Sequence, residues 1–185
     1  DECEGGSSGG VVGGEAVISG STAEEKVWSG LKSMGLTDEV TAGIMGNMAH
    51  EGNNFNPAQH EGSFKSQWGM ALNSNPDIAY GIGLIQWSFG RRVNVYNYIK
   101  DKAPGLTKYL DTPMTYSYAN GSAYGVNGDK FIQLANNESE VNALYSLELT
   151  FLVNEELKVN STYGGVLTQT TVQDAADYFL EKVEV

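Results

Sequence analysis

Apolar residues that recur every three or four positions predict an amphipathic helix shortly after residue 20. Val27 and Leu31 share one face of this helix. A capping box can begin it at Ser21 or at Thr22, because a Glu follows each of them three residues later. Gly35 is expected to end the helix, since glycine is the usual residue just past a helix C-terminus.

The same spacing predicts further helices, over residues 38–51, 90–102, 129–136, 139–158 and 172–179. Gly43 and Gly46 weaken the first of these, at about 1 kcal/mol each relative to alanine, unless close packing uses them. Residues 139–158 are apolar nearly all round, which is typical of a helix at the centre of a core.

Residues 53–90 have no helical spacing and are rich in Asn, Gly, Ser and aromatic residues. Loops and a short β-hairpin are expected there, with residues 80–87 as the most ordered part. Helices therefore dominate around one small β element. The predicted fold class is α+β and predominantly α-helical, and 185 residues are enough for one such domain.

The first twenty residues differ from the rest of the chain. Seven are Gly and three are Ser, so residues 1–20 bury too little apolar surface to offset their ordering entropy. They are predicted to be a flexible linker ahead of a folded domain at 21–185. Such a linker is expected to tether the domain to a membrane anchor or to a larger parent protein.

The charge balance narrows the classes of partner. The chain has 11 Lys and Arg against 23 Asp and Glu, a formal net charge of −12 at pH 7. Nucleic acid is not expected as a partner, because phosphates are held mainly by Lys and Arg. Four of the acids lie in the first twenty residues, which contain no Lys or Arg, so residues 21–185 carry a net charge of −8.

Two histidines, His50 and His60, are each followed by Glu-Gly. A helical zinc site places its histidines four residues apart, whereas these are ten apart across a predicted loop. Neither a bound metal nor another cofactor is expected. Nucleophilic catalysis is also disfavoured, since residues 21–185 contain no G-x-S-x-G turn and the single cysteine, Cys3, lies in the linker.

Catalysis by carboxyl groups is the interpretation that remains. Glu51 falls at the predicted C-terminal end of a helix, where the negative end of the helix dipole disfavours another negative charge. Desolvation by Met48 and Phe55 would act in the same direction. Both effects raise a carboxyl pKa, as a general acid working near neutral pH requires. From its position alone, Glu51 is more often a solvated Glu at a helix end.

Two sequence blocks together resemble the phage tail lysozyme family. The first block is Thr41–Pro57, TAGIMGNMAHEGNNFNP, which is similar to the family's A-G-I-x-G-N helix followed by a Glu and a Phe/Leu-Asn-Pro turn. The second is Tyr80–Trp87, YGIGLIQW, which is similar to the family's G-x-G-x-x-Q-W strand. The later helices also fit, so the resemblance covers about residues 22–185.

The resemblance implies a lysozyme-like fold with the β-hairpin beside the cleft, and it puts Glu51 at the family's acid position. It further implies a glycoside hydrolase that cleaves the β-1,4 bond between N-acetylmuramic acid and N-acetylglucosamine in peptidoglycan. Such domains act outside the cytoplasm, so an extracellular or cell-envelope location, or a phage particle, is expected. Gly52 departs mildly from the small residue, often Ser, that the family has there.

Glycoside hydrolysis ordinarily needs a second carboxylate. Between the two blocks the acids are Glu61 and Asp77, and Asp77 is favoured because it lies just before the predicted hairpin strand. Substrate contacts are predicted for the Gln86 amide and for the aromatic faces of Tyr80 and Trp87, although a core role for Trp87 is nearly as well supported. Arg91 and Arg92 are more typical of a solvated helix start than of a substrate site.

Two other functions stay open at this point. A lytic transglycosylase would use one Glu and no second carboxylate, and it would release an anhydro product. A non-catalytic peptidoglycan-binding module of the same fold would bind without cleaving.

Overall fold

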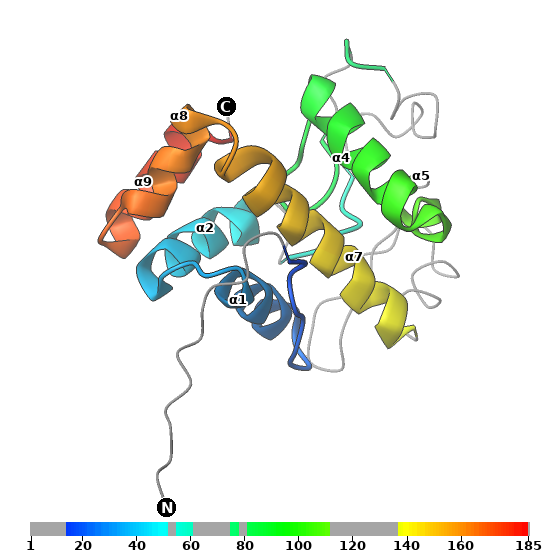
Figure 1. Ribbon diagram of the computed structural model, residues 1–185, viewed down its shortest axis with the longest axis horizontal. Coiled ribbons are helices and arrows are strands. Elements are labelled where there is room, and N and C mark those ends of the chain that lie inside the picture. Colours follow the sequence, from blue (N-terminus) through cyan, green and yellow to red (C-terminus); the bar gives the residue numbers. More distant parts are fainter. Residues whose placement is uncertain (1–13, 52–54, 61–74, 78–80, 112–136, 185) are drawn as a thin grey trace, which may run out of the picture.

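The computed structural model describes residues 14–51, 55–60, 75–77, 81–111 and 137–184 (Figure 1). In these ranges the regular structure is helical: α1 (Ala23–Ser33), α2 (Asp38–Glu51), α4 (Phe89–Lys102), η2 (Pro104–Leu106), α5 (Lys108–Asp111), α7 (Glu138–Thr150), η3 (Phe151–Leu157), α8 (Ser161–Gly164), η4 (Gly165–Thr168) and α9 (Val172–Lys182). The predominantly α-helical class is thus confirmed. None of the helices in the described ranges is both long and apolar enough to cross a membrane.

Side-chain caps start the helices where the sequence predicts them. The Thr22 hydroxyl accepts a hydrogen bond from the Glu25 amide at 3.1 Å, and the Glu25 carboxylate accepts one from the Ser21 amide at 2.8 Å. Thr22 is therefore the cap of α1, one of the two predicted choices. Gly35, with φ of 89°, follows the end of α1, and Thr171 caps α9 through the Asp174 amide. The predicted helix over 129–136 lies outside the described residues.

The helix α7 lies at the centre of the fold, as its apolar sequence predicts. It crosses the molecule between α1 and α2 on one side and α4 on the other (Figure 1). Its buried residues include three that carry polar groups, Tyr145, Glu148 and Thr150. Because polar groups in a core are costly unless they are bonded, these three mark places where α7 binds other segments.

The helix continues past Thr150 as the π-helical segment η3, which the sequence does not predict. The Lys158 amide donates to the Val153 carbonyl five residues earlier, at 3.0 Å. A π-helical turn takes more residues than an α-helical turn, so the side chains that follow it are shifted around the axis. Glu156 lies in this segment and is buried.

The helices α2 and α9 pack closely through a glycine. A Cβ on Gly43 would lie 2.6 Å from the Ala175 Cβ and 2.7 Å from the Ala176 amide nitrogen. Beside it, the Asn47 amide donates to the Ala176 carbonyl at 3.0 Å. A Cβ on Gly46 would meet nothing within 4 Å. Close packing therefore uses Gly43 but not Gly46.

These two glycines form a matched pair for mutation. Gly43→Ala should destabilise the fold by about 1–3 kcal/mol, because backbone atoms of α9 would have to move. Gly46→Ala should stabilise it by about 0.5–1 kcal/mol, because alanine restricts the unfolded chain and adds no clash. Urea unfolding of both variants measures the difference. Equal effects of the two substitutions would contradict the packing of α2 on α9.

The predicted β-hairpin needs correction here. In the described ranges there is no β-strand: the predicted hairpin is reduced to isolated antiparallel bridges that pair Ile82 with His60 and with Trp87. Residues 14–20, part of the predicted linker, are bonded to α7 through Ala16, and the boundary at residue 20 stays a prediction. The Ala16 amide donates to the Thr150 hydroxyl at 2.9 Å, and the Ser146 hydroxyl donates to the Ala16 carbonyl at 2.6 Å. Spacing and composition do not reveal such single anchoring residues.

Candidate functional site

The two sequence blocks meet at a tight turn, residues 81–87. Ile82 and Trp87 exchange backbone hydrogen bonds of 3.0 and 2.9 Å, which close the turn. The Gly83 amide donates to the Gln59 carbonyl at 2.9 Å. The turn is thus bonded directly to the segment 55–60, which follows the end of α2 by only a few residues.

The central helix α7 is hydrogen-bonded to both segments, 55–60 and 81–87. The Tyr145 hydroxyl donates to the Phe55 carbonyl at 2.6 Å. One helical turn later, the Glu148 carboxylate accepts the Leu84 amide at 2.8 Å. A Cβ on Gly83, whose φ is 80°, would lie 2.5 Å from that same carboxylate, so glycine permits this close approach. The helix α7 therefore sets where residues 55–60 and 81–87 lie relative to each other.

Backbone strain concentrates in the same region. In the described ranges, the non-glycine residues with left-handed backbone are Phe55, Gln86 and Phe89, at φ of 63°, 55° and 52°. This conformation costs about 1–2 kcal/mol for a residue with a Cβ. Strained residues gather at functional sites, where the surrounding structure holds them. All three flank the junction between the two blocks, which marks that junction as the candidate site.

The predicted acids are described only in part by the structure. Glu51 is the last residue of α2, so the predicted helix end is confirmed and the negative end of the helix dipole is at this residue. Asp77 is exposed, and its amide is bound by the Asn75 side chain at 2.9 Å. Glu61, the other candidate for the second carboxylate, lies outside the described residues. The pairing of Glu51 with either acid stays a prediction.

The predicted substrate-binding residues, Gln86, Trp87 and Tyr80, differ in what the structure shows of their contacts and burial. The Gln86 amide donates to the carbonyls of Gln59 and Gly83 at 3.2 and 3.0 Å, so it joins the turn to the first block. Trp87 is 1% exposed, and this burial supports the second of its two predicted roles, that of a core aromatic. Tyr80 lies outside the described residues.

Trp87 and Arg91 share one partner, Glu156. The Trp87 indole nitrogen donates to the Glu156 carboxylate at 2.8 Å, and Arg91 donates to it through Nε and Nη2 at 2.6 and 2.8 Å. Arg91 also donates to the Val183 carbonyl, and its guanidinium lies over the Tyr163 ring. Desolvation opposes the charge of Arg91, but the Glu156 carboxylate prevails and raises its pKa.

Neither arginine is the solvated helix-start residue that the sequence favours. Arg92 is fully buried in α4, and it donates to the Asn75 carbonyl at 2.6 Å. It thereby anchors the segment that carries Asp77. Arg91 fastens α4 to η3 and to the end of α9. Both arginines are engaged in hydrogen bonds within the protein.

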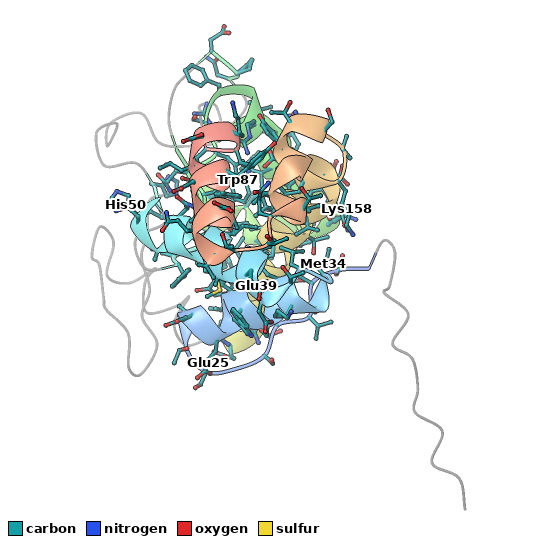
Figure 2. All side chains as sticks on the ribbon, turned by 90° about the vertical axis from the view of Figure 1, so that its left-hand side faces the viewer. Glu25, Met34, Glu39, His50, Trp87 and Lys158 are labelled. Atoms are coloured by element: carbon teal, nitrogen blue, oxygen red, sulfur yellow. The ribbon has the colours of Figure 1, made fainter. Side chains whose placement is uncertain are left out.

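The two histidines have unlike surroundings. His60 is buried, and desolvation lowers its pKa to about 3, so it is neutral at physiological pH. His50 is exposed, and Figure 2 shows it on the opposite side of the molecule from Lys158, with Trp87 between them. Within the described ranges, no three acidic, His or Cys side chains gather as a metal site would require.

Glu148 is a buried carboxyl group with an incomplete set of partners. It is 1% exposed, and its Oε2 atom has no hydrogen-bond partner among the described residues. Burial raises the pKa of Glu148 well above its usual value, and the Leu84 amide opposes this only in part. At moderately acidic pH the folded protein therefore holds a proton here that the unfolded chain releases.

This proton makes stability depend on pH in a defined direction. Since the folded state binds it more tightly, the contribution of Glu148 to stability falls as pH rises above about 4.5, by up to about 1.4 kcal/mol per pH unit. Glu148→Gln keeps an acceptor for Leu84 but cannot ionise. Its stability relative to wild type should therefore increase steadily from pH 4 to pH 8 in urea unfolding. A difference that stays constant over this range would contradict the assignment.

Sequence reasoning missed the supporting role of α7 and η3. Tyr145, Glu148 and Glu156 lie in a stretch recognised only as a core helix. A signal was present, because Glu148 and Glu156 lie in a stretch rich in apolar residues and must be either exposed or bonded inside. The π-helical shift that helps to bury Glu156 has no comparable signature.

Comparison with known proteins agrees with the arrangement of the two blocks. The family model for phage tail lysozyme matches residues 22–185. No curated protein and no solved structure matches the chain significantly.

Proposed function

Since this chain belongs to the phage tail lysozyme family, we propose that it hydrolyses the β-1,4 bond between N-acetylmuramic acid and N-acetylglucosamine, with Glu51 as the general acid. The family is one of lysozyme-like peptidoglycan hydrolases, so the coarse activity follows from membership. The bond and the acid are our own proposal. One observation carries it: α2 ends at Glu51 directly before a segment that is bonded to the strained turn 81–87.

In this mechanism Glu51 donates its proton to the glycosidic oxygen as the bond to the leaving sugar breaks. The C-terminal carbonyls of α2 favour the protonated acid before the reaction. A second carboxylate then stabilises the positive charge on the sugar ring or activates water. We assign this role to Asp77, with Glu61 as the competitor. A separation of about 5 Å between the carboxyl groups would retain configuration, and about 6.5–9.5 Å would invert it.

Gln86 and Trp87 hold the turn 81–87 in a fixed position for this chemistry. Gln86 ties the turn to Gln59, and the buried Trp87 anchors the turn on Glu156. A frame held from several sides keeps the acid and the bound sugar aligned, which is worth orders of magnitude in rate. Tyr80 is proposed to contact the substrate beside this turn. The lysozyme-like cleft and the location of action, at the cell envelope or on a phage particle, belong to the same proposal.

Mass spectrometry of digested peptidoglycan tests the proposal. A muramidase releases fragments that end in a reducing N-acetylmuramic acid. Fragments that end in an anhydro sugar would instead identify a lytic transglycosylase, which needs no second carboxylate. Binding to peptidoglycan without any released fragment would identify a non-catalytic module. The fragment masses separate the hydrolase from the transglycosylase, and co-sedimentation with peptidoglycan detects binding without cleavage.

A further inference from the structure

Phe89, the first residue of α4, is unfavourable in two respects, its exposure to solvent and its backbone conformation. The residue is 51% exposed, so only part of the benefit of burying an aromatic ring is obtained. Its φ of 52° is a left-handed conformation that glycine adopts freely and that a bulky residue adopts at a cost. Packing within the protein does not account for this choice of residue. A ligand that covers the ring would account for it.

The ring stands in a hollow that adjoins the candidate site. This hollow has a volume of about 410 Å³, and its lining includes Gln86, Phe89 and Asn94. Asn94 also lines a second hollow of about 500 Å³ farther along α4, together with Asn97 and Tyr98. The two hollows share Arg91 and Asn94 in their walls, so they adjoin each other along α4, and together they are called the trough here.

Amide groups line this trough in a row. Asn94 and Asn97 are three residues apart on α4, so they lie on one face of the helix, and both are exposed. Neither side chain makes a hydrogen bond to another residue of the described ranges. Each amide therefore offers a donor and an acceptor to a ligand.

The negative charges around the trough favour a neutral ligand over an anionic one. Acidic side chains line both hollows, Glu184 in the first and Asp101 and Glu155 in the second. The cation in both walls, Arg91, is already paired with Glu156. An anionic group such as the lactyl or peptide carboxylate of peptidoglycan would meet repulsion here. A sugar with hydroxyl and acetamido groups would not.

We infer that Phe89, Asn94 and Asn97 form a platform for a neutral N-acetylhexosamine unit of the glycan strand, and that the ring of Phe89 stacks on the apolar face of that sugar. This inference rests on the proposed function, because it names a binding position for the same substrate. The platform selects N-acetylglucosamine over N-acetylmuramic acid, since only the latter carries a carboxylate.

Binding is tested separately from cleavage. The probe is a β-1,4-linked N-acetylglucosamine oligomer, titrated into the full chain that carries Glu51→Gln so that it stays uncut. Adding Phe89→Gly should weaken binding by about tenfold, the loss of one stacked ring. The same change should leave the melting temperature unchanged or raise it, because glycine relieves the strain at this φ. A purely structural role for Phe89 would lower the melting temperature instead.

Three further variants complete the test. Phe89→Tyr should keep the affinity, and Asn94→Ala, which alters only an exposed side chain, should reduce it. Val172→Ala changes another exposed apolar residue at the first position of a helix, α9, and should have no effect on binding. Unchanged affinity in Phe89→Gly overturns the platform, as does a fall in its melting temperature.

The outcome for the platform is independent of the outcome for the enzyme. If the wild-type chain releases no fragments from peptidoglycan but Phe89→Gly still loses oligomer binding, the proposed hydrolase fails and the platform stands. If the wild-type chain cleaves peptidoglycan and Phe89→Gly binds as tightly as its parent, the hydrolase stands and the platform fails.

Discussion

Replacing Glu51 with Gln is expected to lower the rate of peptidoglycan hydrolysis by about 10²- to 10⁴-fold, the usual contribution of a general acid. Glutamine keeps the size and polarity of the side chain but has no proton of suitable acidity to give to the leaving sugar. The fold should be unaffected, because Glu51 is the last residue of α2 and the helix is set by residues before it. Release of reducing ends from purified peptidoglycan measures the rate.

A second glutamate in α2, Glu39, provides a control for this experiment. Glu39 lies in the first turn of α2, exposed and about 18 Å from Glu51 along the helix axis. Glu39→Gln makes the same chemical change on the same element and should leave the rate within a factor of two or so. If Glu51→Gln digests peptidoglycan as fast as Glu39→Gln, Glu51 is not the general acid. Asp77→Asn and Glu61→Gln, compared in the same assay, then identify the second carboxylate.

The second large effect is expected for stability, at Glu156. Glu156→Ala removes the shared acceptor of Trp87 and Arg91, and it leaves a buried indole N–H without this acceptor and the Arg91 guanidinium without its ion-pair partner. Breaking one side of such a buried pair costs about 3–5 kcal/mol, which is a large part of the total stability of a domain. Activity should fall as well, because Trp87 ends the turn that carries Gln86. Urea unfolding followed by tryptophan fluorescence reports both the stability and the environment of the indole.

Glu155, the residue before Glu156, provides a matched control for the Glu156→Ala test. Glu155 is exposed, so Glu155→Ala should change stability by no more than about 0.5 kcal/mol. The two variants remove the same group from adjacent positions of η3. Similar losses in both would mean that the helical segment, and not the contact of Glu156 with Trp87 and Arg91, is sensitive to substitution.

Much of the fold could be predicted from local signals. The caps at Thr22 and Thr171 and the stop at Gly35 act within one helical turn, so the sequence contains them in full. The central position of α7 follows from its apolar composition. The packing use of Gly43, in contrast, depends on Ala175 and Ala176, more than a hundred residues away. No local pattern distinguishes it from Gly46, which packs against nothing.

The candidate site could be predicted less completely. The position of Glu51 at a helix end follows from local spacing, and the order of the two blocks follows from the family resemblance. The burial of Trp87 and the roles of Arg91 and Glu148 depend on which long-range partner each side chain reaches. These partners are set by how α7 and η3 cross the fold, and helical periodicity alone contains no such information.

The support of the site by α7 and η3 has a consequence for the order of events during synthesis. The contacts of Tyr145, Glu148 and Glu156 with the two blocks join residues that are 90, 64 and 69 positions apart. A ribosome therefore completes Glu51 and the turn 81–87 long before it makes the residues that hold them together. Because such distant contacts form last, the emerging chain lacks an assembled site until residues 145–156 have been released. A wall-degrading activity that depends on these contacts is therefore delayed in the cell that makes the protein.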